Sequence, residues 1–254
     1  MRNSKTLAKL RDGQPAKLCN LGHFIPSFVQ MAANVGYDCI WLDAEHRTWT
    51  DRELQAILAY FHLFDIDCML RPATLEKTRL YRYLEDGAAG LMIPHVSTPE
   101  KAQALVDCVK FPPVGDRGLD GVGLDAGFLP ANDTFIDHAN RETFLVVQIE
   151  TPEAVENIDA IAAIEGIDAL FVGPADLGLR IRRSDAKLTL NDAFARVAEA
   201  ADRHGKAWGA PAMSTENVSE LREQGAQLIV HGSDYPALLE MLKQHAAELD
   251  RAFA

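Results

Sequence analysis

The stretch Leu145-Val146-Val147-Gln148-Ile149-Glu150 decides the fold. Its β-branched, apolar character predicts a short buried strand. Gln148 and Glu150 are expected to point to the same side of this strand, because successive side chains alternate with a period of two. Thr151 and Pro152 follow, and a threonine cap with proline at the first helical position is typical of a helix start. The stretch therefore predicts a strand that ends on polar groups and leads into a helix.

The same arrangement recurs further along the chain. Ala169-Leu170-Phe171-Val172 predicts another buried strand, and Gly173-Pro174-Ala175-Asp176 follows it. A carboxylate thus stands after each of two successive strands, and hard divalent cations prefer carboxylate oxygens as ligands. We therefore predict a metal site between Glu150 and Asp176. Spacing alone leaves open the alternative that Glu150 caps a helix and Asp176 is a solvated turn residue.

Short apolar runs alternate with amphipathic stretches along the whole chain. The runs lie at 18–20, 39–42, 68–70, 90–93, 145–149, 169–172, 207–209 and 228–230. The stretches with helical character lie at 51–64, 74–86, 99–109, 152–164, 215–224 and 235–249. Eight strand–helix alternations within 254 residues predict a single (β/α)8 TIM barrel over residues 1–254, in the α/β class. The connection 111–143 is rich in Pro and Gly and is expected to be a loop.

Composition narrows the classes of partner. The formal net charge of -12 argues against nucleic acid and against an anionic membrane surface, because phosphate binding needs a basic face. The four cysteines form no CxxC pair and are interpreted as buried thiols of a reducing compartment. No apolar run approaches the ~20 residues that cross a bilayer, and the first residues do not resemble a signal peptide. We therefore expect a cytoplasmic protein that acts on a small molecule.

Polar side chains follow several of the predicted strands, and in this fold the reaction centre lies at the carboxyl ends of the strands. Arg71 follows the third run and suits a carboxylate or an enolate oxygen, although a structural ion pair with Glu45 is an alternative. Asp43, Glu45 and His46 follow the second run. A carboxylate of this run, Asp43 or Glu45, that orients the imidazole of His46 suits proton transfer near neutral pH, whereas a surface histidine is the alternative.

The turn Gly173-Pro174-Ala175-Asp176-Leu177 presents backbone N–H groups at a helix start, and such groups bind a carboxylate well. Pro174 has no N–H, so Ala175 and Asp176 are the available donors.

Three further residues are weaker candidates. Arg117, in the long connection, could bind a substrate anion or fix its own loop. His95 and His231 are expected to be packing or hydrogen-bonding residues.

Five motifs, taken together in this order, resemble the HpcH/HpaI family of class II, pyruvate-dependent aldolases. The motifs are Trp41-Leu42-Asp43-Ala44-Glu45-His46, Arg71-Pro72, Phe111-Pro112-Pro113-Val114-Gly115-Asp116-Arg117-Gly118, Val147-Gln148-Ile149-Glu150-Thr151 and Phe171-Val172-Gly173-Pro174-Ala175-Asp176-Leu177. The resemblance extends from about Asn20 to about Leu249. It implies a (β/α)8 barrel that forms a homo-hexamer, a trimer of dimers, with the last helix exchanged between neighbouring subunits.

The resemblance also implies roles for individual residues. Glu150 and Asp176 would bind Mg²⁺, Mn²⁺ or Co²⁺, and pyruvate would chelate the ion. Arg71 would stabilise the enolate, and Asp43 with His46 would assist proton transfer.

The substrate contacts follow in the same way. Gln148 would lie beside pyruvate, and the amides of Ala175 and Asp176, in the turn with Gly173 and Pro174, would contact its carboxylate.

The chain departs from the usual family pattern at four places. Arg47 stands where a small residue is usual, after the histidine. Glu85 is aligned with an acidic residue, usually aspartate, that a neighbouring subunit contributes to the site. Residues 178–183 are more basic than usual, and 118–140 differ from the commonest pattern. These departures leave the metal and enolate residues intact and leave the aldehyde acceptor open.

The predicted activity is that of a metal-dependent carbon–carbon lyase, which reversibly cleaves a 4-hydroxy-2-oxo acid to pyruvate, or a close analogue, and an aldehyde. Aldol cleavage leaves an enolate, and a divalent cation with Arg71 would hold the negative charge where it develops. The alternatives are an acyl-CoA lyase like citrate lyase or malyl-CoA lyase, an oxaloacetate decarboxylase, and a non-catalytic barrel that binds sugar acids.

Overall fold

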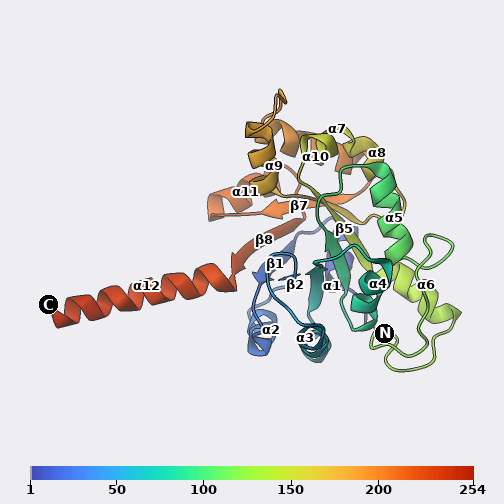
Figure 1. The fold of residues 1–254 in the computed structure, drawn as a ribbon, viewed down its shortest axis with the longest axis horizontal. Coiled ribbons are helices and arrows are strands. Elements are labelled where there is room, and N and C mark those ends of the chain that lie inside the picture. Colours follow the sequence, from blue (N-terminus) through green and yellow to red (C-terminus); the bar gives the residue numbers. More distant parts are fainter. Residues whose placement is uncertain (1) are drawn as a thin grey trace.

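The computed structural model describes residues 2–254 and shows a closed barrel of parallel strands (Figure 1). The strands are β1 (Ala16–Leu21), β2 (Cys39–Asp43), β3 (Asp67–Arg71), β4 (Gly90–Ile93), β5 (Phe144–Ile149), β6 (Ala169–Val172), β7 (Ala207–Pro211) and β8 (Leu228–Ser233). Each strand pairs with the next one in the sequence, and β8 pairs with β1. The predicted (β/α)8 barrel is confirmed, and each predicted apolar run lies within an observed strand.

The helices surround the barrel, and those at 5–11, 26–34, 133–142, 174–182 and 190–203 were not among the six stretches predicted as helical. The helices are α1 (Lys5–Arg11), α2 (Pro26–Asn34), α3 (Asp51–Leu63), α4 (Lys77–Glu85), α5 (Pro99–Val109), α6 (Asp133–Glu142), α7 (Pro152–Glu156), α8 (Ile158–Ala162), α9 (Pro174–Arg182), α10 (Leu190–Arg203), α11 (Thr215–Glu223) and α12 (Asp234–Phe253). The helix predicted at 152–164 is divided at Asn157 into α7 and α8. The prediction of a loop at 111–143 was wrong in part, because α6 begins where the Asn132 side chain accepts a hydrogen bond from Phe135 N–H.

Side chains of each strand alternate between the barrel interior and the surrounding helices. In β5, Leu145 and Val147 pack in the core between the strands and the helices. Phe144 and Val146 belong to a separate cluster of buried residues drawn mainly from alternate strand positions. Because the period is two, Gln148 is the next interior position, at the carboxyl end of the strand. The alternation that buries the core thus also presents polar groups to the barrel mouth.

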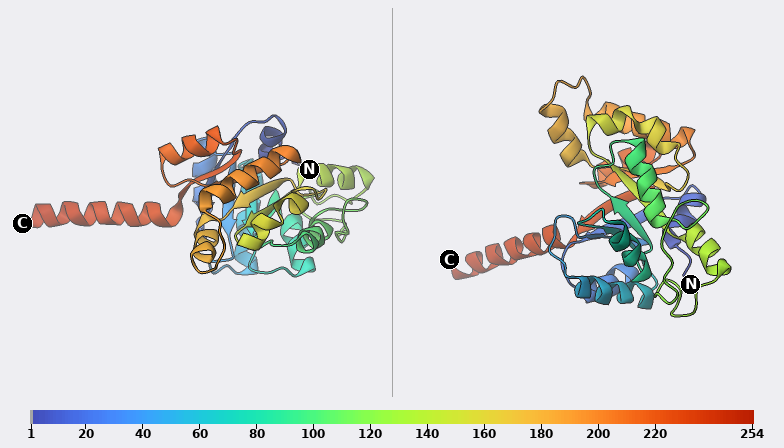
Figure 2. Two further views of the ribbon diagram at one scale, coloured as in Figure 1. Left: turned by 90° about the horizontal axis from the view of Figure 1, so that it is seen from above. Right: turned by 45° about the vertical axis from the view of Figure 1, so that its right-hand side comes forward.

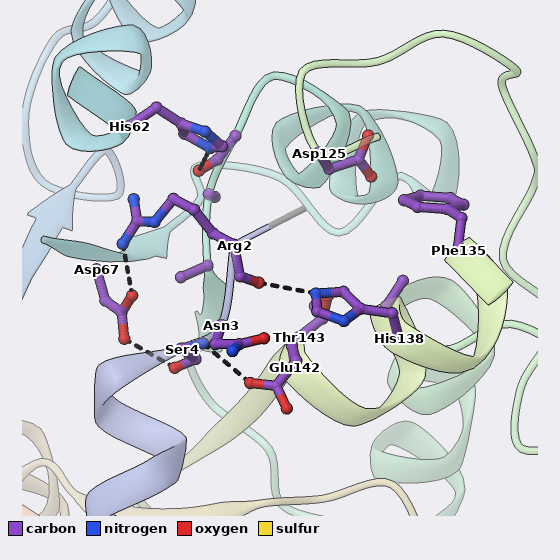
Figure 3. A pocket seen from close by; sticks show the side chains of 14 residues that line it. Arg2, Asn3, Ser4, His62, Asp67, Asp125, Phe135, His138, Glu142 and Thr143 are labelled. Carbon is purple, nitrogen blue, oxygen red and sulfur yellow. Dashed lines mark hydrogen bonds and ion pairs between the residues drawn. The ribbon is translucent and has the colours of Figure 1, made fainter. Parts of the chain in front are cut away.

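The segment before β1 lies against the start of β3 and against α6, where side chains of all three line a pocket (Figure 3). Leu7 of α1 packs into the interior cluster. The buried Asp67 carboxylate accepts hydrogen bonds from Ser4 Oγ at 2.7 Å and Thr6 N–H at 2.8 Å, and it pairs with Arg2 at 2.9 Å. Burial raises the pKa of Asp67, and these donors oppose that effect.

The last helix, α12, projects away from the barrel (Figures 1 and 2). Its first residue, Asp234, is buried and accepts hydrogen bonds from the N–H groups of Gly22 and His23, both at 3.1 Å. Every following residue is exposed, including Leu242 at 60% and Phe253 at 81%. None of the helices described in residues 2–254 is long and apolar enough to cross a membrane.

Candidate active site

Arg71 is fixed at the barrel mouth by ion pairs. Asp43 and Arg71 are cross-strand partners at the carboxyl ends of β2 and β3. Arg71 Nε lies 3.0 Å from Asp43 Oδ1, and Arg71 Nη2 lies 2.9 Å from Asp43 Oδ2. Its Nη1 lies 3.0 Å from Glu45 Oε2, and its Cζ lies 4.5 Å from the centre of the Trp41 ring. The ion pair with Glu45, expected as an alternative, is therefore present, and the bidentate pair with Asp43 sets the plane of the guanidinium.

The imidazole of His46 lies near Glu45, whereas the family resemblance implied Asp43 as its partner. His46 Nε2 lies 3.6 Å from Glu45 Oε2. Asp43 Oδ1 instead accepts hydrogen bonds from the backbone N–H groups of Glu45 at 3.1 Å and His46 at 3.4 Å. Asp43 is the last interior position of its strand, so its carboxylate meets Arg71 there, while the side chain of His46 is 56% exposed.

Glu150 and Asp176 each keep one oxygen without a protein donor among the described residues. Glu150 is buried, and its Oε2 accepts a hydrogen bond from His95 N–H at 3.0 Å. Asp176 lies in the first turn of α9, and its Oδ1 accepts a hydrogen bond from Arg180 Nη1 at 2.7 Å. Burial raises the pKa of Glu150, and the negative charge of Asp176 raises it further. Two carboxylates that repel each other, each with an available oxygen, favour a divalent cation between them.

Gly173 provides the space for the Glu150 carboxylate. A Cβ at position 173 would lie 2.3 Å from Glu150 Oε1 and 2.6 Å from its Cγ. The φ of Gly173 is -96°, which any residue can adopt, so glycine is required here for space. Gly173 also precedes the first turn of α9, where the N–H groups of Ala175 and Asp176 have no intrahelical acceptor.

The imidazole of His95 lies between Glu45 and Glu150, which belong to different strand ends. The sequence did not indicate this position. Its Nδ1 lies 3.1 Å from Glu150 Oε2, without the alignment of a hydrogen bond, and its Nε2 lies 3.5 Å from Glu45 Oε1. The backbone of His95 has a φ of 54°, a left-handed conformation that is uncommon outside glycine. Lys101 Nζ donates a hydrogen bond to its carbonyl at 2.8 Å. The only sequence signal was the position of His95 after the fourth strand.

The remaining predicted residues divide into two groups. Gln148 is buried within the site, and its Oε1 lies 3.5 Å from Arg71 Nη1. Arg117 instead pairs with Asp125 at 2.6 Å, in the connection between α5 and α6. Glu85 ends α4, and burial raises the pKa of its carboxyl while the nearby charge of Arg117 lowers it. The single chain therefore places Glu85 and Arg117 together, in a cluster other than that of Arg71.

The donor set fits a hard divalent ion. Within residues 2–254, no three His, Cys, Asp or Glu side chains converge as one metal-binding group. The protein would therefore offer the carboxylates of Glu150 and Asp176, and water and substrate oxygens would complete the coordination. Mg²⁺ is commonly bound in this way, through one or two carboxylates with the other positions open.

Residues 19–240 match the family of HpcH/HpaI aldolase/citrate lyase proteins. The chain belongs to the HpcH/HpaI family. Members of this family are generally dependent on a divalent metal. Four of the five family motifs thus lie at the one barrel mouth, whereas the motif at 111–118 lies in the connection between α5 and α6.

Curated and solved relatives of this HpcH/HpaI protein include named aldolases. The 4-hydroxy-2-oxovalerate aldolase of Novosphingobium aromaticivorans is 35% identical over 89% of this chain and 87% of the relative. The hydroxypyruvate/pyruvate aldolase of Pseudomonas aeruginosa is 30% identical over 94% of this chain and 90% of the relative. The crystal structure of an HpcH/HpaI aldolase from Desulfitobacterium hafniense DCB-2 is similar with a TM-score of 0.87, 29% identity and 95% coverage of both chains.

Proposed function

We propose that this protein is a divalent-metal-dependent carbon–carbon lyase, which reversibly cleaves a 4-hydroxy-2-oxo acid to pyruvate and an aldehyde. The observation that carries the proposal is the pair of available carboxylate oxygens on Glu150 and Asp176 at a mouth that also holds a fixed Arg71. The named aldolases among its relatives support it. A bound Mg²⁺, Mn²⁺ or Co²⁺ supplies Lewis-acid stabilisation of negative charge on the 2-oxo oxygen.

The side chains of the mouth match the charge that the reaction creates. In cleavage, a base removes the 4-hydroxyl proton, the C3–C4 bond breaks, and its electron pair becomes the pyruvate enolate while the aldehyde leaves. Protonation at C3 then gives pyruvate. Arg71, oriented by Asp43, holds positive charge at the mouth where the enolate forms. We assign proton transfer to His46, with Glu45 as its neighbouring carboxylate.

The start of α9 is the proposed binding site for the substrate carboxylate. The N–H groups of Ala175 and Asp176 are free of intrahelical acceptors, and the positive end of the helix dipole favours an anion there. Pro174 fixes the first helical position without adding a competing donor. Gln148 is buried beside Arg71 and would contact the same substrate.

The proposal is tested by incubating the protein with pyruvate and a panel of aldehydes, with and without EDTA. Aldol adducts should form with metal and disappear after chelation. Glu150→Gln should abolish both the adducts and metal binding measured by calorimetry, because the amide cannot replace an anionic ligand. Glu156→Gln, which removes an exposed carboxylate of α7, is the matched control and should change neither. Adducts that persist after chelation or in Glu150→Gln would contradict the mechanism.

We propose further that α12 packs on a neighbouring subunit in a homo-hexamer. The helix carries exposed apolar residues along its length, including Leu238 and Leu242. A cavity of about 740 Å³ beside β1 and β8 is lined in part by Tyr37, Val218 and Ile229, and apolar surface of this kind suits a helix from a second copy.

Light scattering after size-exclusion chromatography tests this assembly. The wild type should be a hexamer, and Leu238→Glu with Leu242→Glu should give smaller species. Gln244→Glu adds a charge to the same helix at a polar position and should not change the mass. A monomeric wild type would show that the exchange does not occur.

Glu85 is proposed to act in the site of a neighbouring subunit within this assembly. Its Oε1 is buried without a hydrogen-bond partner among the described residues, and burial raises the pKa of its carboxyl. Mixing the inactive variants Glu85→Gln and Glu150→Gln should then restore activity, because some sites would receive both native residues. Failure of the mixed oligomers to regain activity would count against a shared site.

A further inference from the structure

Arg47 is held in a defined position at the barrel mouth. Its side chain packs against the Cα of Gly22, so a Cβ at position 22 would lie 2.9 Å from Arg47 Nε and 3.0 Å from Arg47 Cγ. Nη1 donates a hydrogen bond to the carbonyl of His46 at 2.8 Å. The guanidinium Cζ lies 5.9 Å from the centre of the Tyr235 ring, within reach of a cation–π contact. Three neighbouring strand ends therefore orient this arginine, because the contacts come from residues that follow β1 (Gly22), β2 (His46) and β8 (Tyr235).

The charge of Arg47 has no acidic partner in the described chain. Among residues 2–254, its guanidinium forms no ion pair within 4.0 Å. The other arginines of the mouth differ, because Arg71 pairs with Asp43 and Arg180 pairs with Asp176. An oriented but unpaired guanidinium in a protein of net charge -12 is available to an anion from outside. Its planar set of donors suits carboxylate and phosphate oxygens.

A cavity of about 370 Å³ lies at the same strand ends. Its size is within the range of small-molecule sites. The residues that line it include Asn20, Trp41, Asp43, Ser233 and Pro236. Asp43 connects the cavity to the proposed active site, because the same carboxylate holds Arg71. Arg47 does not line the cavity itself, but its guanidinium lies against Tyr235, whose neighbour in sequence, Pro236, does. The cavity therefore borders on residues that contact Arg71 and on residues next to Arg47.

We propose that Arg47 binds an anionic group at the far end of the acceptor aldehyde, so that the preferred aldehyde carries a carboxylate or a phosphate. This inference rests on the proposed aldol function and names the chemical class of its second substrate. Arg47 is a specificity-determining residue in this scheme. Charge-assisted hydrogen bonds of this kind correspond to a change of about 10- to 100-fold in affinity.

Matched pairs of aldehydes test the proposal in the full-length, metal-loaded protein. Succinic semialdehyde is compared with its neutral methyl ester, and glyceraldehyde 3-phosphate with glyceraldehyde, each with pyruvate as the other substrate. The wild type should prefer at least one anionic aldehyde by about tenfold or more in kcat/KM. Arg47→Gln should remove that preference through KM, with little change in kcat, and Arg47→Lys should retain part of it. The pair that responds identifies whether the anion is a carboxylate or a phosphate.

Arg52→Gln provides the control for net charge, since Arg52 is exposed at the start of the nearby helix α3. It should leave the preference unchanged. Equal kcat/KM for both members of each pair in the wild type, or an equal loss for both in Arg47→Gln, would overturn the inference. A second measurement separates the role of Arg47 from the proposed aldol function. NMR monitors the exchange of the C3 protons of pyruvate with deuterium in the absence of any aldehyde. Metal-dependent exchange without anion preference rejects only the role of Arg47, whereas absence of exchange rejects the proposed function.

Discussion

Gly173→Ala should displace a proposed metal ligand while the fold is retained. The new Cβ would lie 2.3 Å from Glu150 Oε1, whereas real Cβ contacts essentially never fall below 3.0 Å. The carboxylate must therefore move by about 0.7 Å, the difference between these two distances. Functional sites tolerate displacements of about 0.5 Å, and a shift of about 1 Å can cost about 100-fold in rate.

We therefore expect metal affinity to fall by about tenfold or more and kcat to fall by about 100-fold. The free energy of unfolding should decrease by only about 1–3 kcal/mol, the usual cost of an added methyl group in a packed site. The backbone itself is not strained by alanine, since φ is -96° and ψ is 88°. The substitution should thus reduce metal affinity and kcat strongly while the fold is retained.

Three measurements on the same protein test this prediction. Calorimetric titration with Mn²⁺ gives the metal affinity, the aldol assay gives kcat, and thermal unfolding gives the stability. Gly121→Ala is the matched control, because its Cβ would meet no atom within 4 Å. It should leave all three close to the wild-type values. Wild-type metal affinity and activity in Gly173→Ala would refute the reasoning, since they would show that the position of the Glu150 carboxylate does not matter for the ion.

Three further predictions concern charge. Metal-free Glu150→Gln should melt at a higher temperature than the metal-free wild type near neutral pH, because burial raises the pKa of Glu150 and its ionised form therefore lowers stability. The difference in melting temperature should disappear as the pH falls towards about 4.3, where the carboxyl is protonated in both the folded and the unfolded state. A difference that grows at acidic pH would contradict a raised pKa. Arg71→Lys should lower kcat by about 100-fold while calorimetry shows unchanged metal affinity, since lysine cannot form the bidentate pair; an unchanged kcat would exclude the proposed role. Arg2→Ala should lower the free energy of unfolding in urea by about 1–3 kcal/mol by leaving Asp67 buried without its cation. This loss should shrink at acidic pH, where Asp67 is protonated, and metal affinity measured at neutral pH should not change.

The strand pattern, the order of the elements and the closing of the barrel could be predicted from the sequence. Each apolar run became a strand because a buried parallel strand needs little more than four to six apolar residues and turn signals at its ends. The long connection was harder, since its Pro and Gly content concealed the start of α6 at Asn132. The helix at 152–164 was predicted as continuous, and its division at Asn157 shows that periodicity does not set element boundaries well.

The sequence proposed the candidate site as a set of residues and gave few of the contacts between them. Strand periodicity placed Gln148 and Glu150 on one side of a strand. The positions that follow other predicted strands added Asp43, Arg71 and Asp176 as candidates. The partners of these residues came only from the structure. His46 lies near Glu45 and not the Asp43 carboxylate, because Asp43 is a cross-strand neighbour of Arg71.

The sequence by itself determined where each strand lies and which polar residues stand close to its carboxyl end, because a period of two and a turn signal are local properties of the chain. Only the tertiary structure decided what those residues meet. The ring of His95 lies between Glu45 and Glu150, which belong to different strand ends, and Gly173 leaves space for a carboxylate of the neighbouring strand. Such contacts depend on barrel closure and register, and no window of the sequence contains both partners.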